Sequence, residues 1–321
     1  MKNWSISKFW DKWSTFTILI FMLIVFGFLA PGVFFTTSNL IRIAEQSSIT
    51  ILLATGEFFA ILLAGIDLSV GSVMALTGVA SARLMVAGVH PALAVFLGII
   101  LFGAFLGAVN GALISFTKLP PFIITLGTLS IYRGFTLVLS NARAIHGLPA
   151  GFSSFVGGRI FNNMVPIPII IALLTAGILT WFSLKTKPGR NIYAIGGNAD
   201  SAWFAGINVK IHTILVFTLS GLCAGLAGMV NIARLSAAEP NAGMGFETFA
   251  IASVIIGGTS FFGGQGVIPK VVVGGFIIGA INNGLNMVGV SAFYQQIAMG
   301  ALIIIVVTLD RFFGSGSKLR K

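Results

Sequence analysis

KTKPGRNIYAIGGNADSAWFAGINVKIH, residues 185–212, is the stretch around which the rest of the chain is organised. It is polar and basic, whereas apolar runs long enough to cross a membrane lie on both sides of it. Inside it, the sequence predicts a short helix over 199–205. Asn198 can accept a hydrogen bond from a first-turn N–H, and Gly206 can adopt the left-handed conformation that ends a helix. The stretch therefore forms an ordered segment outside the membrane.

The non-polar side of this short helix has nothing in the segment to cover it. Ala202, Trp203 and Ala205 lie on that side, and Asp200 stands where the helix dipole favours an anion. One interpretation is a docking element for a soluble partner. The other is an interfacial helix whose Trp203 and Phe204 rest on lipid headgroups. The residues of the helix alone leave both interpretations open.

Composition identifies the class of protein. Hydrophobic residues make up 56% of the chain, charged residues 8%, and the mean hydropathy is +1.01, so this is an integral membrane protein. The 19 Lys and Arg outnumber the 8 Asp and Glu, but they cluster between apolar spans, which indicates topology signals rather than a nucleic-acid surface. The single cysteine, Cys223, excludes an intrachain disulfide and a cysteine metal cluster.

Ten apolar segments come near the length of about 20 residues that a helix needs to cross the bilayer. They cover approximately 15–34, 43–65, 68–87, 91–116, 121–140, 165–184, 213–233, 247–263, 270–288 and 293–311. Both termini then lie on one side, where most of the basic residues fall. The positive-inside rule places the tails 1–14 and 312–321 in the cytoplasm. The 185–212 loop lies there too, and 15–311 forms a single transmembrane domain.

Glycines recur every four residues in three of these spans, an interval that lets helix backbones approach closely. The predicted packing glycines are Gly103, Gly107, Gly111, Gly221, Gly225, Gly275 and Gly279. The fourth and ninth spans share a phrase, GxxxGAVNG from Gly103 and GxxxGAINNG from Gly275. Because these spans are five apart, they run in opposite directions. This pattern is typical of an inverted repeat of spans one to five and six to ten.

Two glycine-rich breaks interrupt the hydrophobic pattern, GIDLSVGS at 65–72 and GGTSFFGGQG at 257–266. Neither matches the phosphate-binding pattern GxxxxGK[ST], which the chain lacks, so the sequence predicts no ATPase site here. In the first break, Asp67 is most simply the N-cap of the third helix. The alternative is a gate or hinge, since broken helices are where membrane proteins place backbone groups against a ligand.

Four motifs together resemble one family. GIDLSVGS at 65–72, GRNIYAIGGN at 189–198, GGTSFFGGQG at 257–266 and NNGLN at 282–286 are similar to the monosaccharide-importer permeases of ATP-binding-cassette (ABC) systems, the ribose, allose and xylose permeases. The resemblance runs from about Phe34 to Asp310. It is nearest to the branch that carries D-allose, with the D-ribose branch next.

The resemblance implies an all-α, type II (vitamin B12 importer-like) permease that forms a homodimer in the bacterial inner membrane. A periplasmic sugar-binding protein would dock outside. A cytoplasmic ATP-binding subunit, which holds ATP and Mg, would dock inside, so the chain itself needs no cofactor or metal and has no catalytic residues. The coupling helix that enters the ATPase would comprise Asn198, Ala199, Asp200, Ala202, Trp203, Ala205 and Gly206.

Polar residues within the spans and breaks are candidates for a sugar path or gate. They are Thr55, Glu57, Asp67, Ser69, Asn110, Asn282 and Asn283. Glu57 precedes the break at Gly65 by about eight residues, or roughly 12 Å of helix, so it falls near the bilayer midplane. A carboxylate facing lipid at that depth is costly. Glu57 therefore either pairs with Arg133 or contacts sugar hydroxyls.

Two other classes of protein stay in view. A secondary, ion-coupled sugar transporter would also carry an inverted repeat, with Glu57 as its proton carrier. Uptake that survives ATP depletion but collapses with an uncoupler would favour it. A membrane enzyme is disfavoured, because the chain has no HExxH or GxSxG motif and its histidines, His90, His146 and His212, lie in separate loops.

Overall fold

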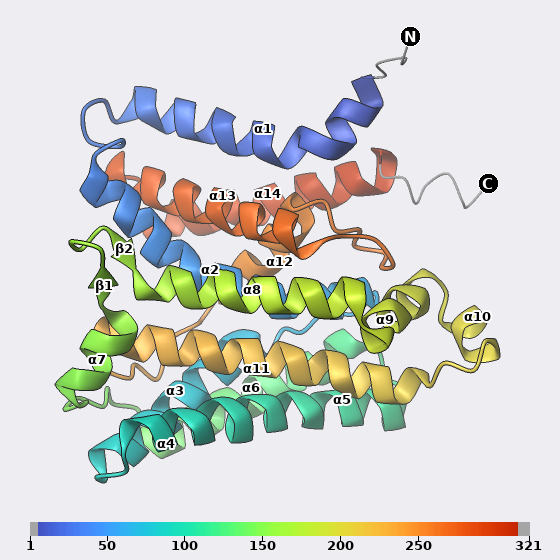
Figure 1. Cartoon of the computed structure of the whole chain (residues 1–321), viewed down its shortest axis with the longest axis horizontal. Coiled ribbons are helices and arrows are strands. Elements are labelled where there is room, and N and C mark those ends of the chain that lie inside the picture. Colours follow the sequence, from blue (N-terminus) through green and yellow to red (C-terminus); the bar gives the residue numbers. More distant parts are fainter. Residues whose placement is uncertain (1–5, 314–321) are drawn as a thin grey trace.

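The computed structural model describes residues 6–313 as a bundle of lengthwise helices (Figure 1). Residues 1–5 and 314–321, parts of the predicted tails, lie outside the described residues. The longer helical units are α1 (Ile6–Leu29), α2 (Thr37–Leu62), α3 (Val70–Val86), α4 (Pro91–Phe96) with η1 (Leu97–Ala104) and α5 (Phe105–Thr117), α6 (Pro121–Ser140), α8 (Ile167–Lys185), α11 (Val209–Leu235), α12 (Phe246–Ile256), α13 (Ile268–Met287) and α14 (Ala292–Phe313). The short elements are α7 (Ala150–Gly157), β1 (Arg159–Ile160), β2 (Val165–Pro166), α9 (Lys187–Gly197) and α10 (Ala199–Phe204).

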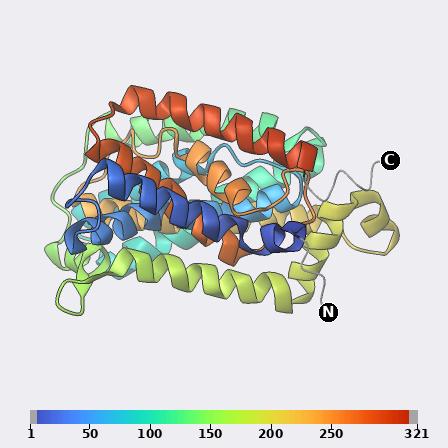
Figure 2. The same cartoon turned by 90° about the horizontal axis from the view of Figure 1, so that it is seen from above.

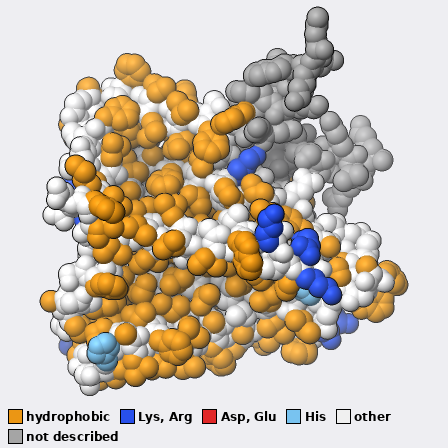
Figure 3. All heavy atoms as spheres, viewed as in Figure 1, with side chains coloured by type: hydrophobic (Ala, Val, Ile, Leu, Met, Phe, Trp, Pro, Cys, Tyr) orange, Lys and Arg blue, Asp and Glu red, His pale blue; other side chains and the backbone are white. Residues whose placement is uncertain are grey.

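Each predicted apolar segment overlaps a helix of this bundle. Among residues 6–313, five helical units are long and apolar enough to cross a membrane by length and composition. They are Pro91–Thr117, α6, α8, α11 and α13. Apolar side chains cover most of the bundle face in Figure 3, and basic side chains gather toward the end that carries α9 and α10. The chain is therefore an integral membrane protein built from helices.

The helices differ in detail from the predicted spans. α1 begins at Ile6, ahead of the predicted span, and its apolar part is Thr15–Leu29. The span predicted over 91–116 contains the π-helix η1, and the residue spacing in the sequence did not predict its wider turns. The eighth span ends at Ile256 instead of 263, because Gly258 has a φ of +76° that a helix cannot continue.

The predicted packing glycines lie where helices touch. A Cβ at Gly103 would stand 2.6 Å from the Gly221 carbonyl oxygen, so η1 and α5 lie backbone to backbone against α11. A Cβ at Gly275 would stand 2.6 Å from the Ile51 side chain and 3.4 Å from its Cα, so α13 also packs closely on α2. Small residues at these positions bring the central helices together.

The main helix contacts follow a pairing rule. The fourth apolar unit (η1 and α5) packs on the seventh (α11), and the ninth (α13) packs on the second (α2). Likewise α3 packs on α6 and α11, while α12 packs on α14 and α2. Exchanging unit n with unit n+5 turns each of these contacts into another, whereas the contacts of α8 with α2 and of α1 with α13 have no such counterpart among the main contacts of the described residues. These contacts support an inverted repeat in the fold.

The two ends of the bundle differ in character. α9 and α10 project from one end, where α1 also begins and α14 also ends (Figures 1 and 2). α7 and the β1–β2 hairpin lie at the opposite end. The hairpin is tied to α2 by an ion pair in which Arg159 donates to Glu45 at 2.7 Å. We call these the α10 end and the hairpin end.

Candidate functional site

A buried hydrogen-bond network surrounds the connection between α2 and α3. Glu57 Oε1 accepts from the Asp67 N–H at 3.0 Å. Asp67 Oδ1 accepts from the Ser69 N–H at 3.0 Å and from its hydroxyl at 2.6 Å. Asp67 Oδ2 accepts from the Ser220 hydroxyl of α11 at 2.8 Å. The Asp67 carboxylate is thus the hub of the network.

The network continues into α5 and α6. Asn110 Nδ2 donates to Ser69 Oγ at 2.8 Å, and the Tyr132 hydroxyl donates to Asn110 Oδ1 at 3.1 Å. All six side chains are buried, with relative exposures of 0–4%. We call Glu57, Asp67, Ser69, Asn110, Tyr132 and Ser220 the buried network. It fixes the start of α3 against α5, α6 and α11.

Asp67 is not the N-cap of the third helix. That position belongs to Ser69, and α3 begins at Val70. Asp67 accepts a hydrogen bond from the N–H of Ser69 two residues on, as in an Asx turn. Its other carboxylate oxygen accepts from Ser220 of α11. The predicted cap residue is instead a tertiary contact.

Of the two alternatives for Glu57, the pair with Arg133 is wrong. Arg133 Nη1 donates to the carbonyl oxygens of Pro240 at 2.6 Å and Ala242 at 2.9 Å, in the connection between α11 and α12. Irregular backbone inside a bundle has carbonyls that need donors, and the guanidinium supplies them. Glu57 has no exposed surface, and its Oε2 has no partner among the described residues.

The other predicted path residues lie elsewhere. Thr55 is buried and donates to the Ile51 carbonyl of its own helix at 2.7 Å. Asn283 is buried, with Oδ1 unpartnered among the described residues. Asn282 instead lines a cavity of about 290 Å³ between α2, α11, α12, α13 and α14. Of the seven predicted path residues, four therefore belong to the buried network and one lines the cavity, while Thr55 and Asn283 belong to neither.

This cavity, which we call the amide cavity, is lined largely by polar side chains. Its lining comprises Gln46, Ile49, Thr50, Asn231, Arg234, Phe246, Phe249, Gly279, Asn282, Asn286 and Gln295. Gln295 Nε2 donates to Asn286 Oδ1 at 2.8 Å, which ties α14 to α13 across the cavity. The lining lies toward the hairpin end, because α2 starts there and α11 and α13 finish there.

The chemistry of the amide cavity suits a polyhydroxylated ligand. Amide side chains offer both donors and acceptors, and Arg234 adds donors. The two phenylalanines offer apolar faces to C–H groups. A few convergent polar groups in a largely apolar bundle are typical of a small-molecule site. Residues 6–313 bring no three His, Cys, Asp or Glu side chains together as a metal site.

Several lining residues were missed by the sequence reasoning, among them Gln46, Asn231, Arg234 and Asn286. Gln46 and Thr50 are four residues apart, as are Asn282 and Asn286, and Asn231 precedes Arg234 by three. Residues at these intervals share one face of a helix. Polar pairs at helical spacing inside apolar spans were the signal that could have found them.

The α10 end contains the short helix that the sequence predicts. Asn198 is its N-cap and accepts the Ser201 N–H at 2.8 Å, while Gly206 has a φ of +81°. The predicted apolar face needs correction, because Ala202 is buried, with an exposure of 4%. Trp203 and Phe204 are exposed at 63% and 81%, with their rings 4.9 Å apart. The available apolar surface is this aromatic pair.

α9, which the sequence reasoning missed, joins the short helix to the bundle. The Gly264 N–H donates to the Leu62 carbonyl at the end of α2, at 2.9 Å. A Cβ at Gly196 of α9 would stand 2.7 Å from that same Gly264 nitrogen. The Tyr193 hydroxyl donates to the Gly266 carbonyl at 3.0 Å, and burial raises the pKa of this phenol above its usual value. The glycine motifs at 189–198 and 257–266 therefore meet at the end of α2.

Comparison with known proteins decides the family. A profile described as "Branched-chain amino acid transport system / permease component" matches residues 39–307. The D-allose transport system permease protein of Escherichia coli is 54% identical over 310 residues, covering 97% of this chain and 94% of that protein. The chain belongs to the ABC monosaccharide-importer permeases. The permease is also similar to the ribose import permease protein of Bacillus subtilis, at 42% identity over 302 residues (94% and 93% coverage).

A third relative of this permease is the ribose import permease protein of Haemophilus influenzae, 38% identical over 321 residues (98% and 97% coverage). No solved structure matches the chain significantly. These relatives cover the buried network, the amide cavity and the α10 end, since each alignment spans nearly the whole permease. They are transport permeases and not enzymes.

Proposed function

We propose that this permease is the membrane subunit of an ATP-driven monosaccharide importer in the bacterial inner membrane, with D-allose as substrate and D-ribose next. The amide cavity carries the proposal, because it places hydrogen-bonding side chains inside a bundle whose exterior is apolar. Similarity to a D-allose permease supports the choice of sugar. In this proposal Asn231 and Asn282 bind hydroxyl groups of the sugar.

The proposed topology has ten spans, with both termini and the α10 end in the cytoplasm. The basic residues near α9 and α10 support that orientation. The paired helix contacts support the inverted repeat, and we assign the fold to the type II importers. Two copies of the permease form the working unit.

Two partners complete the proposed importer. A cytoplasmic subunit holds ATP and Mg and receives α10, whose Trp203 and Phe204 are large exposed apolar side chains outside the apolar bundle. A periplasmic sugar-binding protein docks at the hairpin end, where the amide cavity lies. Neither nucleic acid nor a cofactor of its own has a role.

Sugar uptake tests the cavity. Cells supplied with the partner ATPase and binding protein should accumulate labelled D-allose, and ATP depletion should stop it while an uncoupler alone does not. Replacing Asn231 and Asn282 together by alanine removes two hydrogen bonds to the sugar, each of which contributes about 0.5–1.5 kcal/mol to the binding free energy. We expect the KM for D-allose to rise about tenfold, whereas Ser130→Ala on the exposed side of α6 leaves it unchanged. Uptake that is indifferent to the double variant contradicts the proposal.

Co-purification tests the docking surface. Phe204→Glu places a charge on the exposed aromatic pair and should abolish both association with the ATPase and uptake, without reducing the amount of permease in the membrane. Phe155 at the hairpin end is similarly exposed, at 77%, so Phe155→Glu is the matched control for ATPase association, which it should leave unchanged. ATPase binding that survives Phe204→Glu would favour the interfacial-helix interpretation.

A further inference from the structure

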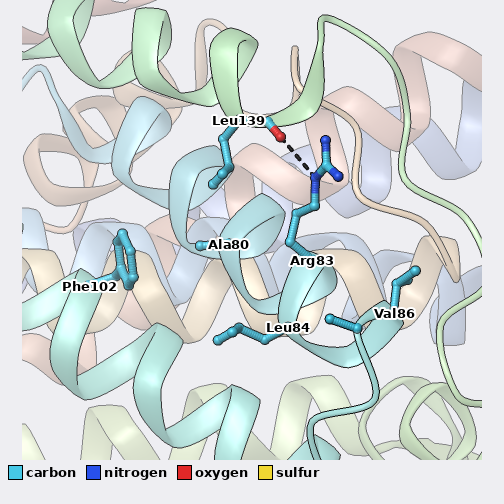
Figure 4. Close-up of a pocket in the computed structure, with 7 residues that line it drawn as sticks. Ala80, Arg83, Leu84, Val86, Phe102 and Leu139 are labelled. Carbon is cyan, nitrogen blue, oxygen red and sulfur yellow. Dashed lines mark hydrogen bonds between the residues drawn. The ribbon is translucent and has the colours of Figure 1, made fainter.

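A second cavity, of about 560 Å³, opens on the outside of the bundle between α3, η1 and α6 (Figure 4). Its lining is apolar apart from one residue. Ala80, Leu84, Phe102 and Leu139 belong to its apolar lining. We call it the Arg83 groove, after the single charged residue in its lining. None of its lining residues belongs to the buried network or the amide cavity.

Arg83 presents unused hydrogen-bond donors at one end of the groove. Its Nε donates to the Leu139 carbonyl at 2.9 Å, which turns the guanidinium toward the end of α6 (Figure 4). A guanidinium has five N–H donors, and the described residues supply no other hydrogen-bond partner and no acidic partner for this one. The terminal nitrogens are therefore available to an anion.

The groove lies within one bilayer leaflet. Arg83 lies four residues before Ala87, the C-cap of α3, or about 6 Å from the end of that helix. Phe102 lies eleven residues beyond Pro91, or about 16 Å into its span. Half of a hydrocarbon core is about 15 Å. The groove therefore covers about 10 Å of depth, from Arg83 a short way below the headgroup level to Phe102 near the bilayer midplane, and the long Arg83 side chain can reach toward the headgroups.

The surface around the groove is apolar and faces outward. Leu101 and Phe105 on one side are 57% and 62% exposed, and Phe135 on α6 is 58% exposed. In a membrane protein such a surface contacts acyl chains, so water does not fill the groove at this depth. An occupant must combine a hydrocarbon chain with an anionic group at one end.

We propose that the Arg83 groove binds an anionic phospholipid from the leaflet at the hairpin end of the bundle. The phosphate of the headgroup accepts hydrogen bonds from the Arg83 guanidinium, which suits bidentate phosphate recognition. One acyl chain lies along Leu84 and Phe102. The bound lipid fills the space between α3, η1 and α6 and holds them together.

The test measures thermal stabilisation of the purified permease in detergent by added phosphatidylglycerol, compared with phosphatidylcholine. We expect stabilisation by phosphatidylglycerol only, with an apparent affinity that falls about fivefold or more in Arg83→Gln. Arg83→Lys retains the charge without the Nε donor geometry and should keep most of the response. Arg143→Gln, which removes another exposed arginine at the same end, should respond as the unmodified permease does.

Further arms distinguish other occupants. Glycerol phosphate, which has the anionic group without acyl chains, should not stabilise the permease. If it does, the site binds a free anion and the proposal fails. An equal phosphatidylglycerol response in Arg83→Gln and the unmodified permease also refutes it. A dimer that dissociates in Arg83→Gln, without any lipid dependence, would show that a second copy covers the groove.

Discussion

Removing the Asp67 carboxylate should destabilise the permease more than any other single truncation in the buried network. Asp67 accepts three hydrogen bonds, from the Ser69 N–H, the Ser69 hydroxyl and the Ser220 hydroxyl, at 3.0, 2.6 and 2.8 Å. Asp67→Ala leaves three donors in a site that is 1% exposed. A buried donor without a partner costs about 1–3 kcal/mol. Because the hydroxyls can turn toward other acceptors, we expect a loss of about 3–6 kcal/mol.

Asp67→Asn keeps the size of the side chain and most of its hydrogen bonds but removes its charge. The amide oxygen can keep both Ser69 bonds, and the Ser220 hydroxyl can turn to accept from the new NH₂ group. The loss should then be about 1–2 kcal/mol, since only the charge-assisted part of the bonds disappears. Asp200→Ala at the exposed α10 end should change stability by less than about 0.5 kcal/mol.

The measurement is the apparent melting temperature of each variant in one detergent, followed by loss of the monodisperse peak on size-exclusion chromatography. We expect the order Asp200→Ala, then Asp67→Asn, then Asp67→Ala, with the last far below the others. If Asp67→Ala melts together with Asp200→Ala, the hydrogen bonds at Asp67 contribute nothing to stability. The description of Asp67 as a hub would then be wrong.

Three further predictions concern other contacts. Glu57→Gln should lower the melting temperature only slightly, because the amide oxygen still accepts the Asp67 N–H. Arg133→Gln should lower the melting temperature by itself and should not rescue Glu57→Gln, so rescue in the double variant would restore the ion-pair hypothesis. Gly107→Leu should separate α5 from α11 and reduce folded yield, whereas Gly127→Leu, where a side chain meets open space, should not. Tyr193→Phe removes one hydrogen bond from the α9 junction and should cost about 1 kcal/mol of thermal stability, and unchanged melting would count against that contact.

The positions of the helices could be predicted from the sequence because apolar length and glycine spacing are local signals. The N-cap Asn198 and the end at Gly206 were equally local, and both were correct. The π-helix over Leu97–Ala104 was not predictable in this way. η1 packs against α3 and α11, and α11 is more than 100 residues away in the sequence.

The partners of buried charges could not be derived from depth alone. Glu57 and Arg133 have compatible depths along their helices, yet each bonds to backbone of an irregular connection. Such connections expose N–H and carbonyl groups whose need for partners has no signature in hydropathy. Polar residues at helical spacing, such as Asn231 and Arg234, are a local signal in the sequence for the amide cavity, which the glycine motifs do not indicate.

The glycine-lined contacts have a consequence for how the protein is made. η1 and α5 pack on α11, and α2 packs on α13, so each of these contacts joins the first half of the chain to the second. During translation α2 and α5 enter the bilayer before α11 has been synthesised. Until the later helices are inserted, the glycine faces of α2 and α5 lack the helices on which they pack in the final fold. A half-length ancestor would have met the same requirement by pairing with an oppositely oriented copy of itself. Two halves expressed as separate polypeptides should therefore assemble in one membrane, while either half alone should be degraded.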